Sequence, residues 1–288
     1  MQLFLEQMLN GIAIGAIYAM ITLGLALVYG ILRILHVAHA AVYTVGAYVG
    51  LAVFAATQNI LLSAAGAMVS CAGLGFLIER FVYYPLLKYP PYVPLIGSIA
   101  CLLAIEEICR LAAGPYILSF PARLPFPSFT VGGIVISSTL TAVYCISAGV
   151  LALLWFITTR TELGLAMRAT SQDMAIASAM GINSHRIISL TFMIGSAVAA
   201  IAGILVGIYY NQVYPSMGAV PAYKTLALIV VGGLGSVPGA VLASILLGVG
   251  ETLLIGYAGI PLPRDALAFI AMIAVLLWRP QGLLGSRG

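Results

Sequence analysis

Charged and reactive side chains are scarce in this 288-residue sequence, and they stand singly or in small groups inside long apolar stretches. Glu106, Glu107 and Arg110 form one such group. Glu106 precedes Arg110 by one helical turn, a spacing at which a carboxylate and a guanidinium can pair. Charges at membrane depth usually face protein or water rather than lipid. The three residues are therefore either part of a solute pathway or a structural pair near a membrane interface.

Two features of the C-terminal half are further pathway candidates. Glu251 is a single acid in an apolar run, where it either hydrogen-bonds to a neighbouring helix or lines a polar cavity. Gly232 and Gly233 begin a glycine-rich break, and exposed backbone at such a break can meet the solute in a transporter. The same glycines can instead form a tight turn, which is the interpretation we favour.

His39 and Tyr43 are the pathway candidates of the N-terminal half. His39 has only His36 nearby and no carboxylate, so a hydrogen bond at a helix end is a better expectation than a metal site. The four cysteines lie in apolar stretches without C-x-x-C spacing, which is typical of packing residues. We predict neither a metal nor a cofactor.

The chain that positions these residues is 62% hydrophobic and only 7% charged, against roughly 25% charged residues in a soluble domain. Long apolar runs and 31 glycines favour closely packed transmembrane helices over a barrel built from strands. The predicted fold class is an all-α integral membrane protein, a polytopic helical bundle in a lipid bilayer. The net charge of +4 comes without a basic run, so nucleic acid is not an expected partner.

A helix needs about 20 apolar residues to cross the hydrocarbon layer. Windows of that kind cover residues 11–32, 37–57, 60–78, 93–113, 138–158 and 188–210. The tail is less regular, because residues 223–258 are too long for one helix, are broken at 232–239, and precede a last apolar stretch at 266–279. This region is one kinked helix, a re-entrant pair or two crossings, and the expected total is about eight to nine transmembrane helices.

The basic residues indicate the orientation, because cytoplasmic loops carry an excess of Lys and Arg. One side of the predicted bundle holds Arg33, Arg80, Lys88, Arg160, Arg168 and Arg186, and the other holds Arg110, Arg123, Lys224 and Arg264. We place the side with six bases in the cytoplasm, the N-terminus outside, and the break at 232–239 in a cytoplasmic turn. Residues 114–136 contain four prolines, which exclude a continuous helix and favour an external surface loop.

Residues 160–187 form the longest polar interruption on the predicted cytoplasmic side. Thr170 followed by Asp173 fits a capping box, and Gly181 is a suitable left-handed stop, so a helix of about three turns is expected between these caps. Alanines one turn apart give this helix a face with small side chains. It either docks on a partner protein or lies on the bilayer surface, and its residues alone do not decide between the two.

Four motifs in order along the chain resemble the permease subunits of ABC importers for branched-chain amino acids. Residues 9–50 look like the first two helices of that family, with residues 36–40 where a Phe-Ala-His-Gly type signature is usual. Residues 168–187 are similar to the loop that ABC permeases press into their ATPases. Residues 230–253 and the ending WRPQGLLG at 278–285 also match closely.

The resemblance implies a single transmembrane permease domain over residues 1–288, with a cytoplasmic coupling loop at about 160–187. On the family's pattern the ATPase-coupling residues are Arg168, Asp173, Ala175, Ile176, Ala179, Met180, Gly181 and Ile182. The implied partners are a second permease subunit, identical or distinct, two ATP-binding cassette ATPase subunits and an extracytoplasmic substrate-binding protein. The implied location is the bacterial inner membrane, which the chain crosses many times.

The expected role is that of a transport subunit, not an enzyme. The sequence lacks the G-x-x-x-x-G-K-[ST] loop that cradles ATP phosphates, so ATP hydrolysis is expected on partner chains. The family resembled here also covers permeases for urea, amides and aromatic acids, so the expected substrate is a branched-chain amino acid or a related small polar metabolite. The alternative is an ion-coupled secondary transporter, in which Glu251 would be the membrane-embedded ion carrier.

Overall fold

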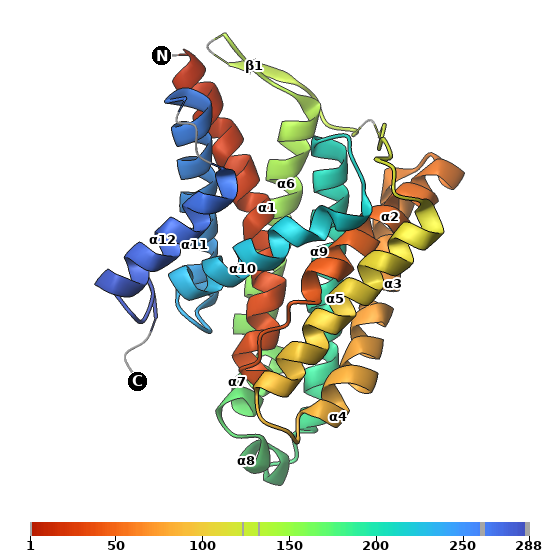
Figure 1. Ribbon diagram of the computed structural model, residues 1–288, viewed down its shortest axis with the longest axis vertical. Helices are drawn as coiled ribbons and strands as arrows, with labels where there is room; N and C mark the ends of the chain where they lie inside the picture. Colours follow the sequence, from red (N-terminus) through yellow and green to blue (C-terminus); the bar gives the residue numbers. More distant parts are fainter. Residues whose placement is uncertain (1, 123, 132, 260–262, 286–288) are drawn as a thin grey trace.

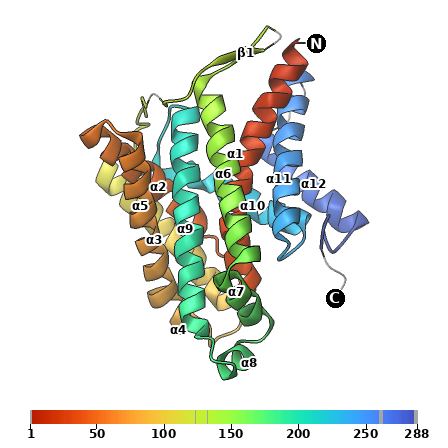
Figure 2. The same ribbon diagram turned by 180° about the vertical axis from the view of Figure 1, so that it is seen from behind.

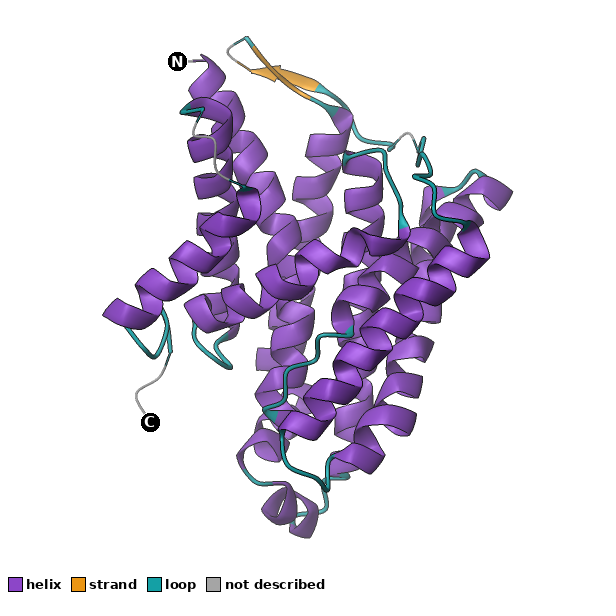
Figure 3. Cartoon of the chain, in the orientation of Figure 1, coloured by secondary structure: helices purple, strands orange, loops and turns teal. Residues whose placement is uncertain are grey.

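The computed structural model describes residues 2–122, 124–131, 133–259 and 263–285, and this part of the chain is almost entirely helical (Figure 3). In chain order the helices are α1 (Gln2–Leu32), α2 (His39–Thr57), α3 (Ile60–Ile78), α4 (Tyr84–Leu86), α5 (Tyr92–Ala113), α6 (Ser138–Arg160), α7 (Glu162–Gln172), α8 (Met174–Ala179), α9 (Ser184–Tyr209), α10 (Ala219–Gly232), α11 (Val237–Glu251) and α12 (Arg264–Trp278). The chain also contains π-helical segments η1 (Glu79–Tyr83) and η3 (Thr252–Tyr257), the 3-10 turn η2 (Pro215–Gly218), and the strands β1 (Phe129–Val131) and β2 (Ile134–Ile136).

Seven of the described helices are long and apolar enough to cross a membrane. They are α1, α2, α3 continued to Leu86, α5, α6, α9, and α11 continued to Tyr257. Helices α10 and α12 have 14 and 15 residues and are shorter than a full crossing requires. The all-α polytopic fold is confirmed. In the described ranges, the expected eight to nine transmembrane helices correspond to the seven long helices together with the short helices α10 and α12.

The apolar windows in the sequence agree closely with these helices, because a backbone surrounded by lipid must satisfy its hydrogen bonds within its own segment. The window 60–78 coincides with α3. The windows for α5 and α6 differ from the helices by at most two residues at either end. The window 11–32 starts too late, since α1 already begins at Gln2.

Helix α1 runs through the middle of the bundle, and 89% of its apolar window is buried. Its main neighbours are α11 on one side and α9 on the other (Figure 1). Helices α2 and α3 pack against α9 and against each other. The resulting core is one apolar cluster with large members such as Met20, Phe192 and Leu205, and a smaller cluster joins α10, α11 and α12.

The segment between α1 and α2 is not helical, and Figure 1 shows it running back along the bundle before α2 begins at His39. Arg33, with a φ of 53°, follows the end of α1 and starts this reversal. Irregular backbone among membrane helices requires protein partners for its polar groups. One such partner is the hydroxyl of Ser98, which accepts a 2.9 Å hydrogen bond from the amide of Ala38.

The proline-rich loop 114–136 is not helical, as expected. It contains the antiparallel hairpin β1–β2, and Leu118 forms an isolated bridge with Val213. Figure 2 shows the hairpin at the end of the bundle opposite α8. An external loop and a cytoplasmic α8 must lie on opposite sides of the membrane, and the positions of the hairpin and α8 agree with that requirement. Arg123, one of the bases counted for the orientation, lies outside the described residues.

Candidate functional site

The polar segment 160–187 folds into two helices, α7 and α8, which form an elbow at one end of the bundle (Figure 2). The prediction of one helix of about three turns starting at Thr170 is wrong, since Thr170 lies inside α7 and α8 has only six residues. The chain breaks at Asp173, whose backbone is extended with a φ of −157°. The Oδ1 atom of Asp173 accepts the N–H bonds of Ala175 and Ile176 at 2.7 and 2.9 Å. Asp173 is therefore the N-cap of α8 rather than the third residue of a capping box.

Helix α8 ends at the glycine that the sequence marks as its stop. Gly181 has a φ of +89°. The amide of Ile182 donates to the carbonyl of Ala177, and the amide of Gly181 donates to that of Ser178, both at 3.0 Å. These two bonds form a Schellman cap, which favours glycine at the left-handed position. Both ends of α8 are thus fixed by local hydrogen bonds.

One face of α8 is exposed and apolar. The side chains of Ile176 and Met180 are 64% and 79% exposed, and Ala175 and Ala179 are exposed beside them. Ala177, on the opposite face, is only 4% exposed and packs toward the bundle. The helix is therefore held by one side while it presents small and flexible apolar side chains outward, which is typical of a contact surface for another protein.

Arg168 contacts the helical bundle and is not part of the exposed face of α8. Its guanidinium donates a hydrogen bond to the carbonyl of Thr158, near the end of α6. Met167, its neighbour on α7, is buried. Arg168 therefore fastens α7 to α6 and sets the direction in which the elbow points.

A groove of about 780 Å³ lies beside the elbow. Its walls come from α1, α6, α7 and the start of α11, with Arg168 and Ser171 on one side and Ser236 and Pro238 on the other. The elbow and the turn between α10 and α11 therefore face each other across a space rather than through a packed contact.

A buried ion pair joins α10 to α11. Nζ of Lys224 lies 2.8 Å from Oε1 of Glu251, and both side chains are 2% exposed. Tyr18 of α1 completes the contact, since its hydroxyl accepts a bond from Lys224 at 3.0 Å and donates to Oε2 of Glu251 at 3.1 Å. The hydrogen bonding to neighbouring helices that the sequence suggested for Glu251 is present, and Glu251 also lines a cavity of about 360 Å³ whose other walls are apolar.

The placement of Lys224 in an external loop is wrong. The residue lies inside α10, and the carboxylate of Glu251 compensates its charge there. The network continues to the start of α12, where Oδ1 of Asp265 lies 3.4 Å from Nζ of Lys224. Oδ2 of Asp265 accepts a 2.6 Å hydrogen bond from the hydroxyl of Tyr223. Sequence reasoning missed this network, and its only signal was the presence of single charges in otherwise apolar runs.

Gly232 and Gly233 end α10 in a tight turn, which is the interpretation favoured from the sequence. Gly233 has a φ of +107°. A Cβ atom at this position would lie 2.6 Å from the amide nitrogen of Gly285, so the turn and the C-terminal segment approach closely through their backbones. Only glycine satisfies both the backbone angle and the short approach.

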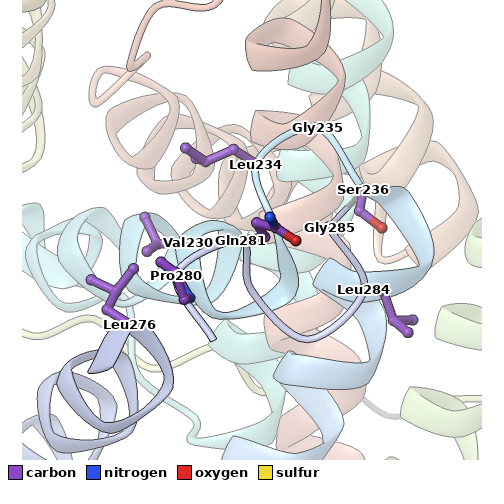
Figure 4. A pocket seen from close by; sticks show the side chains of 9 residues that line it. All are labelled: Val230, Leu234, Gly235, Ser236, Leu276, Pro280, Gln281, Leu284 and Gly285. Carbon is purple, nitrogen blue, oxygen red and sulfur yellow. The ribbon is translucent and has the colours of Figure 1, made fainter. Parts of the chain in front are cut away.

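The two C-terminal motifs that carry the family resemblance thus meet in space. The amide of Leu283 donates to the carbonyl of Val231 at 2.8 Å, which binds the C-terminal segment to the end of α10. Figure 4 shows the pocket of about 500 Å³ that lies beside this junction, with Ser236 and Gln281 as its polar side chains. The motifs are parts of one structural unit at the α10–α11 turn.

His39 and Tyr43 lie inside the packed core. The ring of His39 lies beside the backbone of Ile21 on α1, but neither ring nitrogen makes a hydrogen bond of normal geometry. The adjacent His36 does have a partner, because its Nδ1 lies 2.7 Å from the hydroxyl of Tyr83. Sequence reasoning missed this contact, which ties the segment before α2 to η1.

The charged group on α5 pairs as its spacing predicts. A guanidinium nitrogen of Arg110 lies 3.2 Å from Oε1 of Glu106, and the other lies 3.3 Å from Oε2 of Glu107. Arg110 and Glu107 are about half exposed, whereas Glu106 is more enclosed. The ion pair is confirmed, and it lies on the outside of the bundle.

Membrane-length helices, short apolar helices tied by a buried ion pair, and an exposed elbow define a polytopic membrane protein. A model of the family described as "Branched-chain amino acid transport system / permease component" matches residues 7–276. The chain belongs to this family and is a multi-pass inner membrane protein.

Relatives of known name match over almost the whole chain. The high-affinity branched-chain amino acid transport system permease protein BraD of Pseudomonas aeruginosa is 33% identical over 295 residues, which cover 98% of this chain and 96% of that protein. The permease protein LivH of Escherichia coli K12 is 34% identical with the same coverage. The permease protein LivM of the same organism is 27% identical and covers 93% of this chain and 68% of its own length. No solved structure matches the chain.

Proposed function

We propose that this chain is the membrane-spanning permease subunit of an ATP-binding cassette importer that moves branched-chain amino acids, or a related small polar metabolite, into the cytoplasm. The observation that carries the proposal is the capped, exposed elbow helix α8 in a chain whose full-length relatives are named as high-affinity branched-chain amino acid permeases. A passive channel would not need an exposed cytoplasmic helix that docks on an ATPase.

In this proposal α8 is the surface that docks on an ATPase. Ile176 and Met180 insert apolar side chains into the partner, because they project from the bundle and lack contacts that would bury them. Ala175 and Ala179 allow the partner to approach the helix backbone closely. The face is small, so each of these positions matters for the fit.

The neighbouring residues pass the movement of α8 into the membrane helices. Asp173 and Gly181 cap the two ends of α8, so the helix moves as a rigid piece. Ile182 follows the cap and leads the chain directly into α9. Arg168 holds α7 to the end of α6 through the carbonyl of Thr158. A displacement of α8 is therefore transmitted to α9 and α6 together.

The remaining work of the importer belongs to partner chains. ATP is hydrolysed by two ATPase subunits, since this sequence has no phosphate-binding loop of the usual pattern. The relatives named LivH and LivM support a second, distinct permease that forms the pore together with this chain. An extracytoplasmic binding protein delivers the substrate, and residues 1–288 act as one transmembrane domain.

The pathway candidates take two different roles in this proposal. Glu106 and Glu107 lie at the outer surface of the bundle, where a pathway shared with the second permease would run. The other candidates are enclosed in the core or in a turn, and they position helices instead of contacting substrate. They are His39, Tyr43, Gly232, Gly233 and Glu251.

An ion-coupled secondary transporter is less well supported. Its carrier would be Glu251, but this carboxylate is paired with Lys224 and receives a hydrogen bond from Tyr18. Protonation of Glu251 would leave the buried charge of Lys224 with the hydroxyl of Tyr18 and the longer contact to Asp265, and without the carboxylate at 2.8 Å. The pair therefore suits a permanent structural link better than a reversible ion site.

Reconstitution tests the proposal. Proteoliposomes would contain this chain with the second permease and the ATPases encoded beside it, together with the binding protein, and uptake of labelled leucine would be measured. We expect uptake to require internal ATP and the binding protein, and to be reduced by unlabelled isoleucine or valine but not by urea. Uptake driven by a proton or sodium gradient in the absence of the ATPases would contradict the assignment.

A further inference from the structure

Helix α5 lies on the outside of the described bundle and crosses it obliquely (Figure 1). Only 17% of its apolar window is buried. Its main neighbours are α2 and the short elements η1, η2 and α4. Most of the surface of this membrane-length helix is therefore left for lipid or for another protein to cover.

The outward face of α5 is a continuous stripe at helical spacing. Its exposed members are Ile96, Ala100, Leu103, Ala104, Glu107 and Leu111, and all successive pairs except Leu103 and Ala104 are three or four residues apart. All of them are apolar except Glu107, which carries Arg110 as its ion-pair partner. A charged pair thus interrupts a surface that otherwise resembles a lipid-facing helix.

Contact with lipid alone is unfavourable for this stripe, because the stripe contains a charged side chain. Glu107 lies six residues before Ala113, the end of α5, which is about 9 Å along the helix axis. Apart from its ion-pair partner Arg110, the neighbouring exposed side chains along the stripe, Leu103 before it and Leu111 after it, are apolar. The ion pair is therefore set within an apolar belt rather than at its edge. Ionisable side chains in such a belt almost always face protein or water.

The other exposed helix faces differ in this respect. In the described residues, the exposed side chains along the middle of α3, α6 and α12 are uncharged, as Val69, Leu153 and Ile273 illustrate. These faces are suited to contact with acyl chains. The stripe on α5 is set apart from them by its charge.

We propose that this stripe of α5 is the surface on which the second permease subunit packs, an inference that rests on the proposed function for the existence of that subunit. Ala100 and Ala104, four residues apart, let a helix of the partner approach closely. Two glutamates against one arginine leave a formal charge of −1 beside the stripe. The partner helix is therefore apolar with small residues and presents one basic side chain at the level of Glu107.

Site-specific photo-cross-linking tests the inference. The chain is co-expressed with the second permease encoded beside it, which carries an epitope tag, and benzoylphenylalanine replaces Leu103. Val69 on α3 and Leu153 on α6 are matched control positions, since all three side chains are more than half exposed. We expect an adduct with the tagged permease at Leu103, roughly tenfold above either control. An adduct at Val69 or Leu153 without one at Leu103 would overturn the assignment.

The experiment separates this inference from the proposed function. If the tagged permease does not co-purify with the unmodified chain, the importer assembly itself is wrong. If it co-purifies but Leu103 gives no adduct with it, only the assignment of the α5 stripe is wrong. An adduct between two copies of this chain would overturn the commitment to a distinct partner.

Two substitutions give an independent readout. Ala104→Trp fills the space needed for close approach, and Glu107→Gln removes the charge that the partner compensates. We expect each to lower recovery of the tagged permease by roughly fivefold or more while the abundance of this chain in the membrane is unchanged. Ala65→Trp, at an exposed alanine of α3, is the matched control and should leave recovery unchanged. Normal recovery with both α5 variants would overturn the proposal.

Discussion

Nζ of Lys224 lies 2.8 Å from Oε1 of Glu251, and this contact closes α10 onto α11 across the tight turn that joins them. Both side chains are 2% exposed, so water contributes little to the stabilisation of either charge. Tyr18 adds α1 to the contact, and Asp265 adds α12. Helix α10 is too short to span the membrane, and this network is what anchors it among its neighbours.

The first prediction concerns this pair. Lys224→Met removes the cation that lies 2.8 Å from the buried carboxylate of Glu251, so we expect the free energy of unfolding to fall by about 3–5 kcal/mol. In the double variant Lys224→Met/Glu251→Met no buried charge is left unpaired at this contact, and we expect it to be more stable than Lys224→Met alone. Thermal unfolding in detergent, with membrane abundance as a second readout, measures both. Additive losses in the double variant would show that the two residues do not depend on each other.

The second prediction concerns the exposed face of α8. Ala175→Trp and Ala179→Trp place bulk where a partner must approach, so we expect each to reduce ATP-dependent uptake and recovery of the ATPases by more than about tenfold, with normal membrane abundance. Glu162→Trp, at an exposed position of α7, is the control and should retain activity. Ala177 is unsuitable as a control, because it is buried and a tryptophan there would disturb packing. Full transport in both alanine variants would mean that α8 merely lies on the membrane.

The third prediction concerns the cap of α8. Gly181→Pro cannot adopt a φ of +89° and removes the amide that donates to Ser178, so we expect uptake to be lost. Gly181→Asn is the matched variant, because asparagine tolerates the left-handed region and nothing lies within 4 Å of the added Cβ. It should retain most of the transport rate. Equal loss in both variants would assign the role of Gly181 to something other than its backbone angle.

The fourth prediction concerns the α10–α11 turn. Gly233→Ala and Gly235→Ala both introduce a side chain at a positive φ, which costs on the order of 1 kcal/mol. Only the Cβ atom at position 233 also meets a backbone atom, the amide nitrogen of Gly285 at 2.6 Å. We therefore expect Gly233→Ala to lower the unfolding temperature more than Gly235→Ala. The same decrease in both variants would argue against the close approach of the C-terminal segment.

The fifth prediction concerns orientation. In a cysteine-free background, Ser128→Cys in the loop before β1 and Gln172→Cys at the end of α7 should react with a membrane-impermeant thiol reagent from opposite faces of the membrane. Both positions are exposed. The elements beside them, β1 and α7, lie at opposite ends of the bundle (Figure 2). Labelling of both from the same face would contradict this topology, and labelling of Gln172→Cys from outside the cell would reverse the placement of the elbow in the cytoplasm.

Features that depend on neighbours along the chain were predictable from the sequence. Apolar windows located the long helices, because a segment in lipid must satisfy its own backbone hydrogen bonds. The spacing of Glu106 and Arg110 predicted their ion pair, and Gly181 marked the end of α8. Each of these outcomes requires only residues within a turn or two of each other.

The break at Asp173 shows where local signals fail. The spacing of Thr170 and Asp173 fits a capping box, and Asp173 does cap a helix, but α7 extends through Thr170. Thr170 is 1% exposed and is held within α7 by packing against the bundle. An aspartate side chain fits the N-cap and the third helical position alike, and the choice between them depends on which preceding residues find a place to pack.

The sequence by itself determined the class of this protein, the approximate positions of its first six long helices and the glycine that ends α8. The tertiary structure alone decided that Lys224 is an interior residue, that the motifs at 230–253 and 278–285 form one unit, and that α5 has an uncovered charged face. The physical reason is that burial of a charge depends on its partner. Glu251 and Tyr18 reach Lys224 only after α1, α10 and α11 have packed together, and no local pattern in the chain specifies that meeting.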